Sequence, residues 1–202
     1  DLPLLEVHAD LDADITDVSY DSRQTQSGGL FVAIAGAETD GHRFIPMARD
    51  KGAVCVVCQR APECEIPYVI VEDSRRALAV IACSWFDHPS REMTMIGVTG
   101  TSGKTTTTHM VKSVLEAAGR KVGMIGTNGI YYMGCHKETA NTTPESYELQ
   151  KTFREFLDAG CDTALMEVSS QGLMMDRVAG VHYDVGVFTN LSPDHIGPGE
   201  HK

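Results

Sequence analysis

The sequence predicts an α/β protein with two parts: a small α/β domain at residues 1–90, then a parallel-sheet domain with a phosphate-binding loop (P-loop) at residues 91–202. Three observations predict this architecture. Short β-branched or apolar runs alternate with segments of helical spacing along the chain. A glycine-rich loop joins a strand to a helix just before Lys104. An interruption with a proline and several charges, Asp87–Glu92, separates the two series of elements.

In the first part, runs rich in β-branched residues predict three short strands. They are Gly29–Ile34, Ala53–Val57 and Tyr68–Val71. Residues 42–53 lie between the first two strands and have helical spacing. After the third strand, Asp73 or Ser74 is placed to cap a helix that continues to residue 86.

The second part repeats the alternation of strands and helices. We expect strands at residues 93–100, 121–127, 162–168 and 184–190, a hairpin at 129–139, and helices at 104–119 and 142–160. The last helix shows Thr143 as N-cap, Pro144 at its first position, Glu145 in the first turn and Gly160 after its end. Such alternation predicts buried strands in a parallel sheet that is covered on both faces. The final segment, Pro193–Lys202, is loop-like, so we expect this domain to be incomplete.

Composition excludes several classes of protein. The chain has 202 residues, is 42% hydrophobic and carries a formal net charge of -11 without a basic stripe, which argues against a nucleic-acid partner. No apolar run approaches the roughly 20 residues of a membrane span. The pair Cys55 and Cys58 has zinc or redox spacing, but it lies in an apolar run with no second such pair. We interpret the cysteines as small core residues in a reducing cytoplasm.

The loop before Lys104 has the chemistry of a nucleotide site. Backbone N–H groups and the helix dipole at a helix N-terminus attract phosphate. Lys104 supplies a charge for the outer phosphates, and Thr105 a hydroxyl for Mg²⁺. The generic pattern expects a glycine where Val98 stands, which leaves a glycine-rich turn with a surface lysine as the alternative. The strand before the loop and the helix after it favour the nucleotide site.

Candidate metal ligands follow two other strands. Glu167 ends an apolar run, and a buried carboxylate is costly unless it is paired or metal-bound. Asn190, Asp194 and His195 follow the last strand. Alone, His195 would be an ordinary loop histidine and Asp194 a helix cap. Their place beside other carboxyl ends of parallel strands, where open α/β sheets bind ligands, favours a site.

Taken together, these motifs resemble the Mur ligase family, ATP-dependent ligases that build the peptide of bacterial cell-wall precursors. The loop GTSGKT is similar to the family loop, in which a valine at position 98 is no defect. Three stretches resemble the MurE branch, which adds the third peptide residue. They are the segment from Tyr20 to Val57, NTTPE and MEVSSQGLMMDRV. TNLSPDH resembles the family's strand-end histidine motif. The resemblance covers nearly the whole chain.

The resemblance implies a cytoplasmic ligase of peptidoglycan synthesis that uses ATP and Mg²⁺ and acts as a monomer. Its substrate would be UDP-N-acetylmuramoyl-L-Ala-D-Glu. ATP would phosphorylate the D-Glu carboxylate, and the amine of meso-diaminopimelate or L-lysine would attack the acyl phosphate. The C-terminal domain that selects the amino acid is expected to be missing, so the chain would be an inactive fragment. The resemblance leaves the choice of diamino acid open.

The resemblance also implies roles for particular residues. The ATP phosphates would be bound by Gly100, Thr101, Ser102, Gly103, Lys104, Thr105 and Thr106. The metal would be held by Thr105, Glu167 and His195, and catalysis would depend on Lys104, Glu167 and His195. The muramoyl-peptide would contact Asn141, Thr142, Thr143, Ser169 and Arg177. The uridine end would contact Tyr20, Ser22, Ala37, Glu38 and Thr39.

Some positions depart from the family pattern or have another explanation. Met175 replaces a polar residue of some relatives, and Asp21 and Arg23 could only shape their turn. Arg177 alone could be a surface arginine on a helix. The family's carbamylated lysine would lie beyond residue 202.

Two other classes of function stay open. One is another P-loop enzyme, such as a folylpolyglutamate synthase-like ligase or a small kinase, which lacks the N-terminal motif. The other is a non-catalytic UDP-muramoyl-peptide-binding module.

Overall fold

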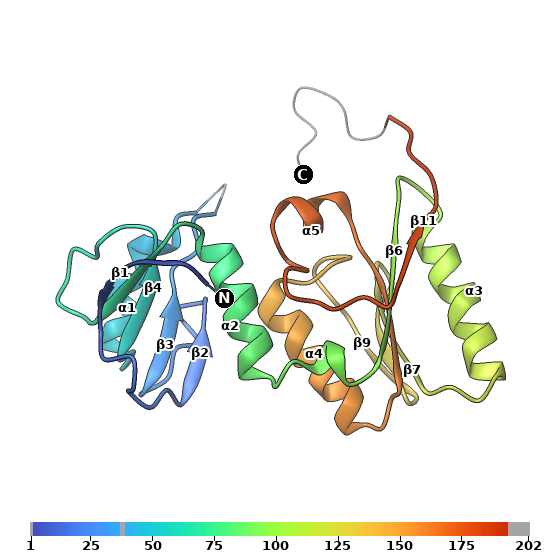
Figure 1. Cartoon of the computed structure of the whole chain (residues 1–202), viewed down its shortest axis with the longest axis horizontal. Coiled ribbons are helices and arrows are strands. Elements are labelled where there is room, and N and C mark those ends of the chain that lie inside the picture. Colours follow the sequence, from blue (N-terminus) through green and yellow to red (C-terminus); the bar gives the residue numbers. More distant parts are fainter. Residues whose placement is uncertain (1, 37–38, 194–202) are drawn as a thin grey trace. The chain divides into compact units, whose positions relative to one another are not determined.

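The computed structural model describes residues 2–36 and 39–193, which divide into two units, Asp1–Trp85 and Phe86–Lys202. The division lies close to the boundary that we expect after residue 90. Within the described ranges, none of the helices has the length and apolarity that crossing a bilayer requires. Figure 1 shows each unit as a sheet with helices packed against it.

The sheet of the first unit has five strands in the order β1-β5-β4-β3-β2. Its elements are β1 (Leu4–His8), β2 (Asp17–Ser19), β3 (Gly29–Val32), η1 (Gly41–Phe44), α1 (Ile45–Asp50), β4 (Cys55–Cys58), β5 (Tyr68–Val71) and α2 (Ser74–Trp85). Strands β2 to β5 are parallel, and β1 pairs antiparallel with β5. Alternate strand residues face α1, where Phe31 and Val56 are fully buried with Ile45. Helix α2 packs against β3 and β4.

The sheet of the second unit has six strands in the order β11-β6-β10-β7-β8-β9. Its elements are η2 (Pro89–Arg91), β6 (Thr94–Thr99), α3 (Lys104–Ala117), β7 (Val122–Gly126), β8 (Gly129–Tyr132), β9 (Cys135–Lys137), α4 (Ser146–Asp158), β10 (Thr163–Glu167), α5 (Ser170–Met174) and β11 (Val185–Phe188). The four strands β11, β6, β10 and β7 are parallel, and the predicted hairpin adds β8 and β9 antiparallel. The predicted α/β fold is confirmed.

Apolar residues on the parallel strands alternate between two cores. Met166 faces α4 with Phe153 and Phe156, while its neighbour Leu165 faces α3. Figure 1 shows α3 and α4 on opposite sides of this sheet. The two covered faces explain why the central positions of β6, β10 and β7 are apolar or glycine. Because β6 and β10 run parallel, both end at the edge of the sheet where α5 begins.

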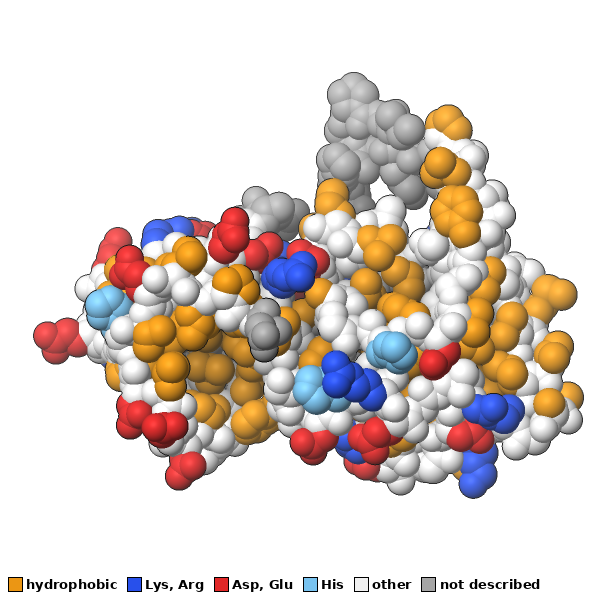
Figure 2. Space-filling model, viewed as in Figure 1, with side chains coloured by type: hydrophobic (Ala, Val, Ile, Leu, Met, Phe, Trp, Pro, Cys, Tyr) orange, Lys and Arg blue, Asp and Glu red, His pale blue; other side chains and the backbone are white. Residues whose placement is uncertain are grey.

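Two expectations about the elements are wrong: the start of α4 and the burial of β11. Glu145 takes the N-cap position of α4 in extended conformation and is not in the first turn, so Thr143 and Pro144 both lie outside the helix. Strand β11 is not buried: it is an edge strand, and Phe188 is 64% exposed. Orange side chains are visible along this segment at the upper right of Figure 2. The short elements β1, β2 and α5 were not predicted, because each has too few residues to show a periodic pattern. Tertiary packing stabilises them.

Charged side chains are distributed in agreement with the acidic composition. On the face shown in Figure 2, Lys and Arg are scattered among acidic residues and form no continuous basic patch.

A close approach between β7 and α4 gives a stability prediction. A Cβ added at Gly123 would lie 2.2 Å from Cδ2 of Phe156, which is fully buried. We expect Gly123→Ala to lower the free energy of unfolding by about 2 kcal/mol, since overpacked cores lose about 1–3 kcal/mol. Gly186→Ala in β11 is the control, because nothing lies within 4 Å of its added Cβ. Urea unfolding measures both variants, and equal stability of the two would contradict the packing argument.

Candidate functional site

The loop between β6 and α3 has the backbone of a phosphate cradle. Gly100 and Gly103 have φ values of 133° and 82°, which favour glycine. A Cβ at Gly100 would lie 2.1 Å from Oγ1 of Thr189, whereas nothing lies within 4 Å of one at Gly103. The loop thus needs glycine at Gly100 for packing and at both positions for conformation. Its end forms the N-terminus of α3, where N–H groups lack partners within the helix.

Lys104, the first residue of α3, reaches back over this loop. Its Nζ donates to the carbonyl oxygens of Gly100 at 2.6 Å and Thr101 at 3.0 Å. The ammonium group is therefore held at the loop by two neutral backbone carbonyl groups, and neither partner is a carboxylate. A phosphate oxygen would be a stronger, charge-assisted acceptor for the same donor. Thr106, in the first turn of the helix, is exposed.

The segment after β11 braces the loop. The Asn190 side chain accepts from Ser102 N at 3.1 Å and donates to Ser102 O at 3.1 Å. The Asn190 carbonyl accepts from Thr101 N at 3.0 Å, and Thr189 Oγ1 donates to Ser102 O at 2.8 Å. Asn190, expected among the metal candidates, is thus a support of the phosphate loop in this structure. Asp194 and His195 lie outside the described residues.

Glu167 brings the strand ends together. It is the last residue of β10 and is 2% exposed. Its Oε2 accepts from Thr105 Oγ1 at 2.9 Å and Thr127 Oγ1 at 3.1 Å, and its Oε1 accepts from Thr127 N at 3.0 Å. The predicted proximity of Glu167 and Thr105 is therefore present. Oxygen atoms of a carboxylate and a hydroxyl are the ligands that Mg²⁺ prefers, so this donor set fits that ion.

Thr127 was not predicted as a site residue. It follows β7, and the sequence shows it only as the last residue of an expected strand. Its hydroxyl also lies 3.0 Å from Oγ1 of Thr142. Gly126 precedes it, and a Cβ there would lie 2.2 Å from Oε1 of Glu167. Only the pairing of β7 with β10 brings these residues to the carboxylate.

The expected substrate residues Thr143 and Ser169 lie directly beside Glu167. Thr143 is buried, and its Oγ1 donates to the backbone oxygen of Glu167 at 3.0 Å and accepts from Ser169 N at 2.9 Å. Ser169 caps α5 by accepting from Gly172 N at 3.0 Å. The Thr143 hydroxyl is thus used in hydrogen bonds to Glu167 and Ser169, which explains why Thr143 does not cap α4. Asn141 is exposed and accepts through its carbonyl oxygen from Thr139.

Arg177 joins the same cluster from beyond α5. Its guanidinium donates to Thr143 O at 3.1 Å and forms an ion pair with Glu145, in which the two side chains are 11% and 17% exposed. Arg177 is thus mostly buried, and the alternative of a surface arginine is wrong. Glu145, which the sequence shows only as a helix-start signal, is a second residue that the sequence did not predict for this site.

In the first unit, the expected uridine contacts lie around the turn after β2 and the segment before η1. Ser22 is buried, and its hydroxyl donates to Sδ of Met47 at 3.3 Å. Tyr20 is half-buried and Thr39 is exposed. Asp21 accepts from Arg23 N at 2.9 Å and pairs with the Arg23 side chain, so both shape the turn. Ala37 and Glu38 lie outside the described residues.

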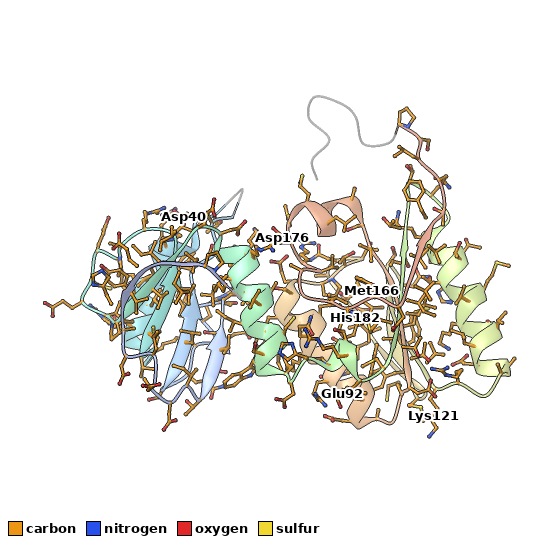
Figure 3. The ribbon with its side chains drawn as sticks, in the orientation of Figure 1. Asp40, Glu92, Lys121, Met166, Asp176 and His182 are labelled. Carbon is orange, nitrogen blue, oxygen red and sulfur yellow. The ribbon has the colours of Figure 1, made fainter. Side chains whose placement is uncertain are left out.

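Asp40 anchors the segment that follows these positions. Asp40, labelled in Figure 3, forms an ion pair with Arg60 at 2.5 Å and accepts a hydrogen bond from Nδ1 of His42 at 2.7 Å. His42 is buried and accepts through Nε2 from Gln59 N at 2.9 Å. The Arg60 guanidinium, together with the hydrogen bonds from His42, holds the pKa of Asp40 well below its usual range. Asp40 therefore ties the segment to β4 through charge.

This anchor predicts a pH dependence of stability. The folded-state pKa of Asp40 is lower than the unfolded one, so its contribution is present above about pH 4 and is lost as pH falls. We expect Asp40→Asn to lower the free energy of unfolding by about 1 kcal/mol at pH 7 and by less at pH 3. Urea unfolding followed by Trp85 fluorescence measures it. The control is Asp50→Asn, which breaks an exposed pair with Arg49. An equal loss for Asp40→Asn at both pH values would contradict the argument.

The bracing of the phosphate loop gives a second prediction, which uses amide hydrogen exchange. In Asn190→Ala, the Ser102 amide loses its side-chain acceptor, while the Thr101 amide keeps the backbone oxygen of residue 190. We expect exchange at Ser102 to rise up to about tenfold, as the loss of one hydrogen bond implies, with a smaller change at Thr101. Unchanged exchange at Ser102 would show that Asn190 does not hold the loop.

Comparison with known proteins gives a consistent family. A model of the Mur ligase middle domain matches residues 98–202, and a model of the Mur ligase family catalytic domain matches residues 14–85. Two relatives are named UDP-N-acetylmuramoyl-L-alanyl-D-glutamate–2,6-diaminopimelate ligase. The one from Bacillus licheniformis is 46% identical over 188 residues, covering 92% of this chain and 38% of that protein. The one from Geobacillus thermodenitrificans is 45% identical over 195 residues, covering 96% and 40%.

Solved structures share the fold. A structure of UDP-N-acetylmuramoyl-L-alanyl-D-glutamate–2,6-diaminopimelate ligase superposes with a TM-score of 0.79 at 24% identity, covering 94% of this chain and 40% of that one. The MurF ligase of Thermotoga maritima in complex with ADP gives 0.62 at 25% identity, covering 91% and 39%. The chain spans about two fifths of the length of these relatives. Since the middle-domain model alone matches more than half of its residues, the chain belongs to the Mur ligase family.

Proposed function

We propose that the chain is the nucleotide- and substrate-binding part of an ATP-dependent ligase of peptidoglycan synthesis. The ligase would join a diamino acid to UDP-N-acetylmuramoyl-L-alanyl-D-glutamate. The observation that carries the proposal is the position of Glu167. Its carboxylate contacts Thr105 beside the phosphate loop, and its backbone oxygen contacts Thr143 of the expected substrate cluster. One residue therefore joins a nucleotide cradle to a peptide site.

In this proposal the phosphates of ATP lie on residues 100–106. The N–H groups at the start of α3 and the ammonium of Lys104 neutralise their charge. Thr105, Glu167 and His195 would hold Mg²⁺, which as a Lewis acid polarises the phosphoryl oxygens. The burial of Glu167 beside neutral hydroxyl and amide donors supports this role, because a cation would complete the environment of a carboxylate that no lysine or arginine pairs with among the described residues.

The chemistry fits the two halves of the site. A carboxylate is a poor acyl donor until one of its oxygens carries a phosphate leaving group. Phosphoryl transfer from ATP would form an acyl phosphate on D-Glu and release ADP. The amine would then attack the acyl carbon, and the C–O bond to phosphate would break as the amide forms. The protein's contribution would be positioning and charge neutralisation, with Lys104 on the phosphates and Arg177 on an anionic group of the muramoyl-peptide.

The two parts of the chain would divide the ligand between them. Residues 1–90 would bind the uridine end through Tyr20, Ser22 and the segment 37–39. Residues 91–202 would bind ATP and, through Asn141, Thr142, Thr143, Ser169 and Arg177, the muramoyl-peptide. The names of the two bacterial relatives favour 2,6-diaminopimelate over L-lysine as the amine. We place this reaction in the cytoplasm, where ATP and the nucleotide-sugar substrate are available.

A folylpolyglutamate synthase-like function has weaker support. The solved structure of Mycobacterium tuberculosis folylpolyglutamate synthase covers only 60% of the chain, with a TM-score of 0.51 at 20% identity. The Mur ligase family model also matches residues 14–85, which supports a UDP-binding first part. Binding of UDP by the chain separates the two functions.

The proposal predicts that Lys104 is required for nucleotide binding. We expect Lys104→Met to weaken ATP affinity at least about 100-fold, since a charged partner of the phosphates is lost from the site. Isothermal titration calorimetry on the 202-residue chain, with Mg²⁺ present, measures it. Lys112→Met is the matched control, because Lys112 lies in the same helix and pairs with Glu116. Similar losses in both variants would argue against a site at the loop.

The activity itself is tested in the whole protein that carries these 202 residues. Phosphate release is measured with UDP-N-acetylmuramoyl-L-Ala-D-Glu, ATP and either meso-diaminopimelate or L-lysine. We expect release to depend on all three substrates and to be faster with diaminopimelate. Release with dihydrofolate and glutamate, but not with the muramoyl-peptide, would overturn the proposed function.

A further inference from the structure

Thr127 makes two contacts with Glu167, one to each carboxylate oxygen. Its backbone N–H donates to Oε1 at 3.0 Å, and its hydroxyl donates to Oε2 at 3.1 Å. A carboxylate held at one oxygen can still rotate about its terminal bond, whereas contacts at both oxygens define its plane. Thr105 reaches only Oε2, at 2.9 Å. Of these two residues, Thr127 is therefore the one that contacts both oxygens of the carboxylate.

The backbone beside Thr127 restricts the same group. Gly126 lies so close that a Cβ there would be 2.2 Å from Oε1 and 2.9 Å from Cδ of Glu167. The backbone at the end of β7 thus packs directly against the carboxylate, and the N–H of Thr127 donates to it from this backbone. At 2% exposure, Glu167 has little water to replace a lost donor. Removing the Thr127 hydroxyl would leave Oε2 with one fewer donor in a buried site.

The hydroxyl of Thr127 also connects Glu167 to Thr142, one of the expected contacts of the muramoyl-peptide. It lies 3.0 Å from Oγ1 of Thr142. A hydroxyl has one proton, and Thr127 gives its own to Glu167 because a carboxylate is an acceptor only. Thr142 is then the donor in the contact between the two threonines. This order produces a chain of hydrogen bonds from Thr142 through Thr127 to the carboxylate.

We propose that Thr127 is a positioning residue that holds the Glu167 carboxylate in the orientation required for binding the nucleotide-bound divalent cation, and that its hydroxyl links this cation site to Thr142. The inference rests on the proposed function, in which Glu167 holds the metal. It adds a residue outside the phosphate loop and outside the substrate cluster. It also gives a physical route by which occupation of the muramoyl-peptide site changes metal affinity. Thr142 is an expected contact of the muramoyl-peptide and is also the donor to Thr127.

The test measures the affinity of Mn²⁺ for the 202-residue chain saturated with a non-hydrolysable ATP analogue. Free Mn²⁺ is followed by electron paramagnetic resonance. We expect Thr127→Val, which keeps the backbone N–H and removes the hydroxyl, to weaken Mn²⁺ binding at least about 10-fold, as loss of an outer-shell partner does. Thr127→Ser keeps the hydroxyl and should bind within about threefold of the unmodified chain. The affinity for the analogue without metal should not change in either variant.

The matched control is Thr163→Val. Thr163 is buried and begins β10, at the opposite end of the strand from Glu167, and its hydroxyl donates to Asp162 at 2.6 Å. This variant loses a hydroxyl of the same sheet, so it reports the effect of lower stability alone. We expect its Mn²⁺ affinity to be unchanged. If Thr127→Val does not fold, as judged by circular dichroism, Thr127→Ala is measured in its place.

A further variant tests the link to the substrate segment. Thr142→Val removes the donor to Thr127 but leaves both contacts between Thr127 and Glu167. We expect a loss of Mn²⁺ affinity of about threefold, and no added loss when it is combined with Thr127→Val, because coupled residues are not additive. Additive losses would show that the two threonines act separately.

The outcomes distinguish this inference from the proposed function. Failure of the unmodified chain to bind Mn²⁺ with the nucleotide would contradict the proposed function itself. Binding by the unmodified chain together with unchanged affinity in Thr127→Val would overturn only the role of Thr127. Equal losses in Thr127→Val and Thr163→Val would also overturn it, because they would assign the effect to stability. A loss confined to Thr127→Val, with recovery in Thr127→Ser, supports the inference.

Discussion

The carboxylate of Glu167 is the group around which the second unit is organised. It is buried at the end of β10 and is surrounded by hydroxyl and amide donors from two other segments. Burying a charge with neutral partners is costly, and folding alone gives no reason to place a glutamate in an otherwise apolar strand. The cation site that we propose supplies the reason. The parallel arrangement of β6, β10 and β7 is what brings Thr105, Glu167 and Thr127 to one edge.

The same edge explains the contacts of the neighbouring segments. Thr143 donates to the backbone oxygen of Glu167 and accepts from the backbone N–H of Ser169, so Thr143 and the start of α5 are both held beside the carboxylate. The buried pair of Arg177 and Glu145 continues this network to the start of α4. On the other side, Asn190 holds the phosphate loop from the segment after β11. The phosphate loop and the proposed muramoyl-peptide contacts are thus connected through one network of hydrogen bonds, which suits the proposed reaction between two bound ligands.

Local sequence patterns predict the parts of the candidate site that depend on neighbouring residues. The glycines and Lys104 identify the phosphate loop because its function requires a fixed spacing between a strand and a helix. Glu167 is identified because an acid in an apolar strand is unusual. The order of strands and helices also follows from the sequence pattern, since both faces of β6, β10 and β7 are covered and the central positions of these strands are apolar or glycine.

The remaining features depend on contacts between segments distant in the sequence. Thr127 is an ordinary strand-end threonine until β7 pairs with β10. Thr143 has the residue type of a helix cap, but a tertiary hydrogen bond to Glu167 takes its hydroxyl, and Glu145 becomes the cap. Glu145 itself gains its role only because Arg177 folds back from beyond α5. Strand β11 is apolar like its neighbours yet exposed, because its place at the edge of the sheet is a property of topology.

The most direct test of the central claim is a crystal structure of the chain with a non-hydrolysable ATP analogue and Mn²⁺, with the metal located by its anomalous scattering. The account predicts the triphosphate on the loop, Lys104 turned from the carbonyls of Gly100 and Thr101 to a phosphate oxygen, and the metal within about 2.3 Å of Thr105 Oγ1 and a Glu167 oxygen. A nucleotide bound elsewhere, or a metal that leaves Glu167 bonded only to Thr105 and Thr127, would contradict it.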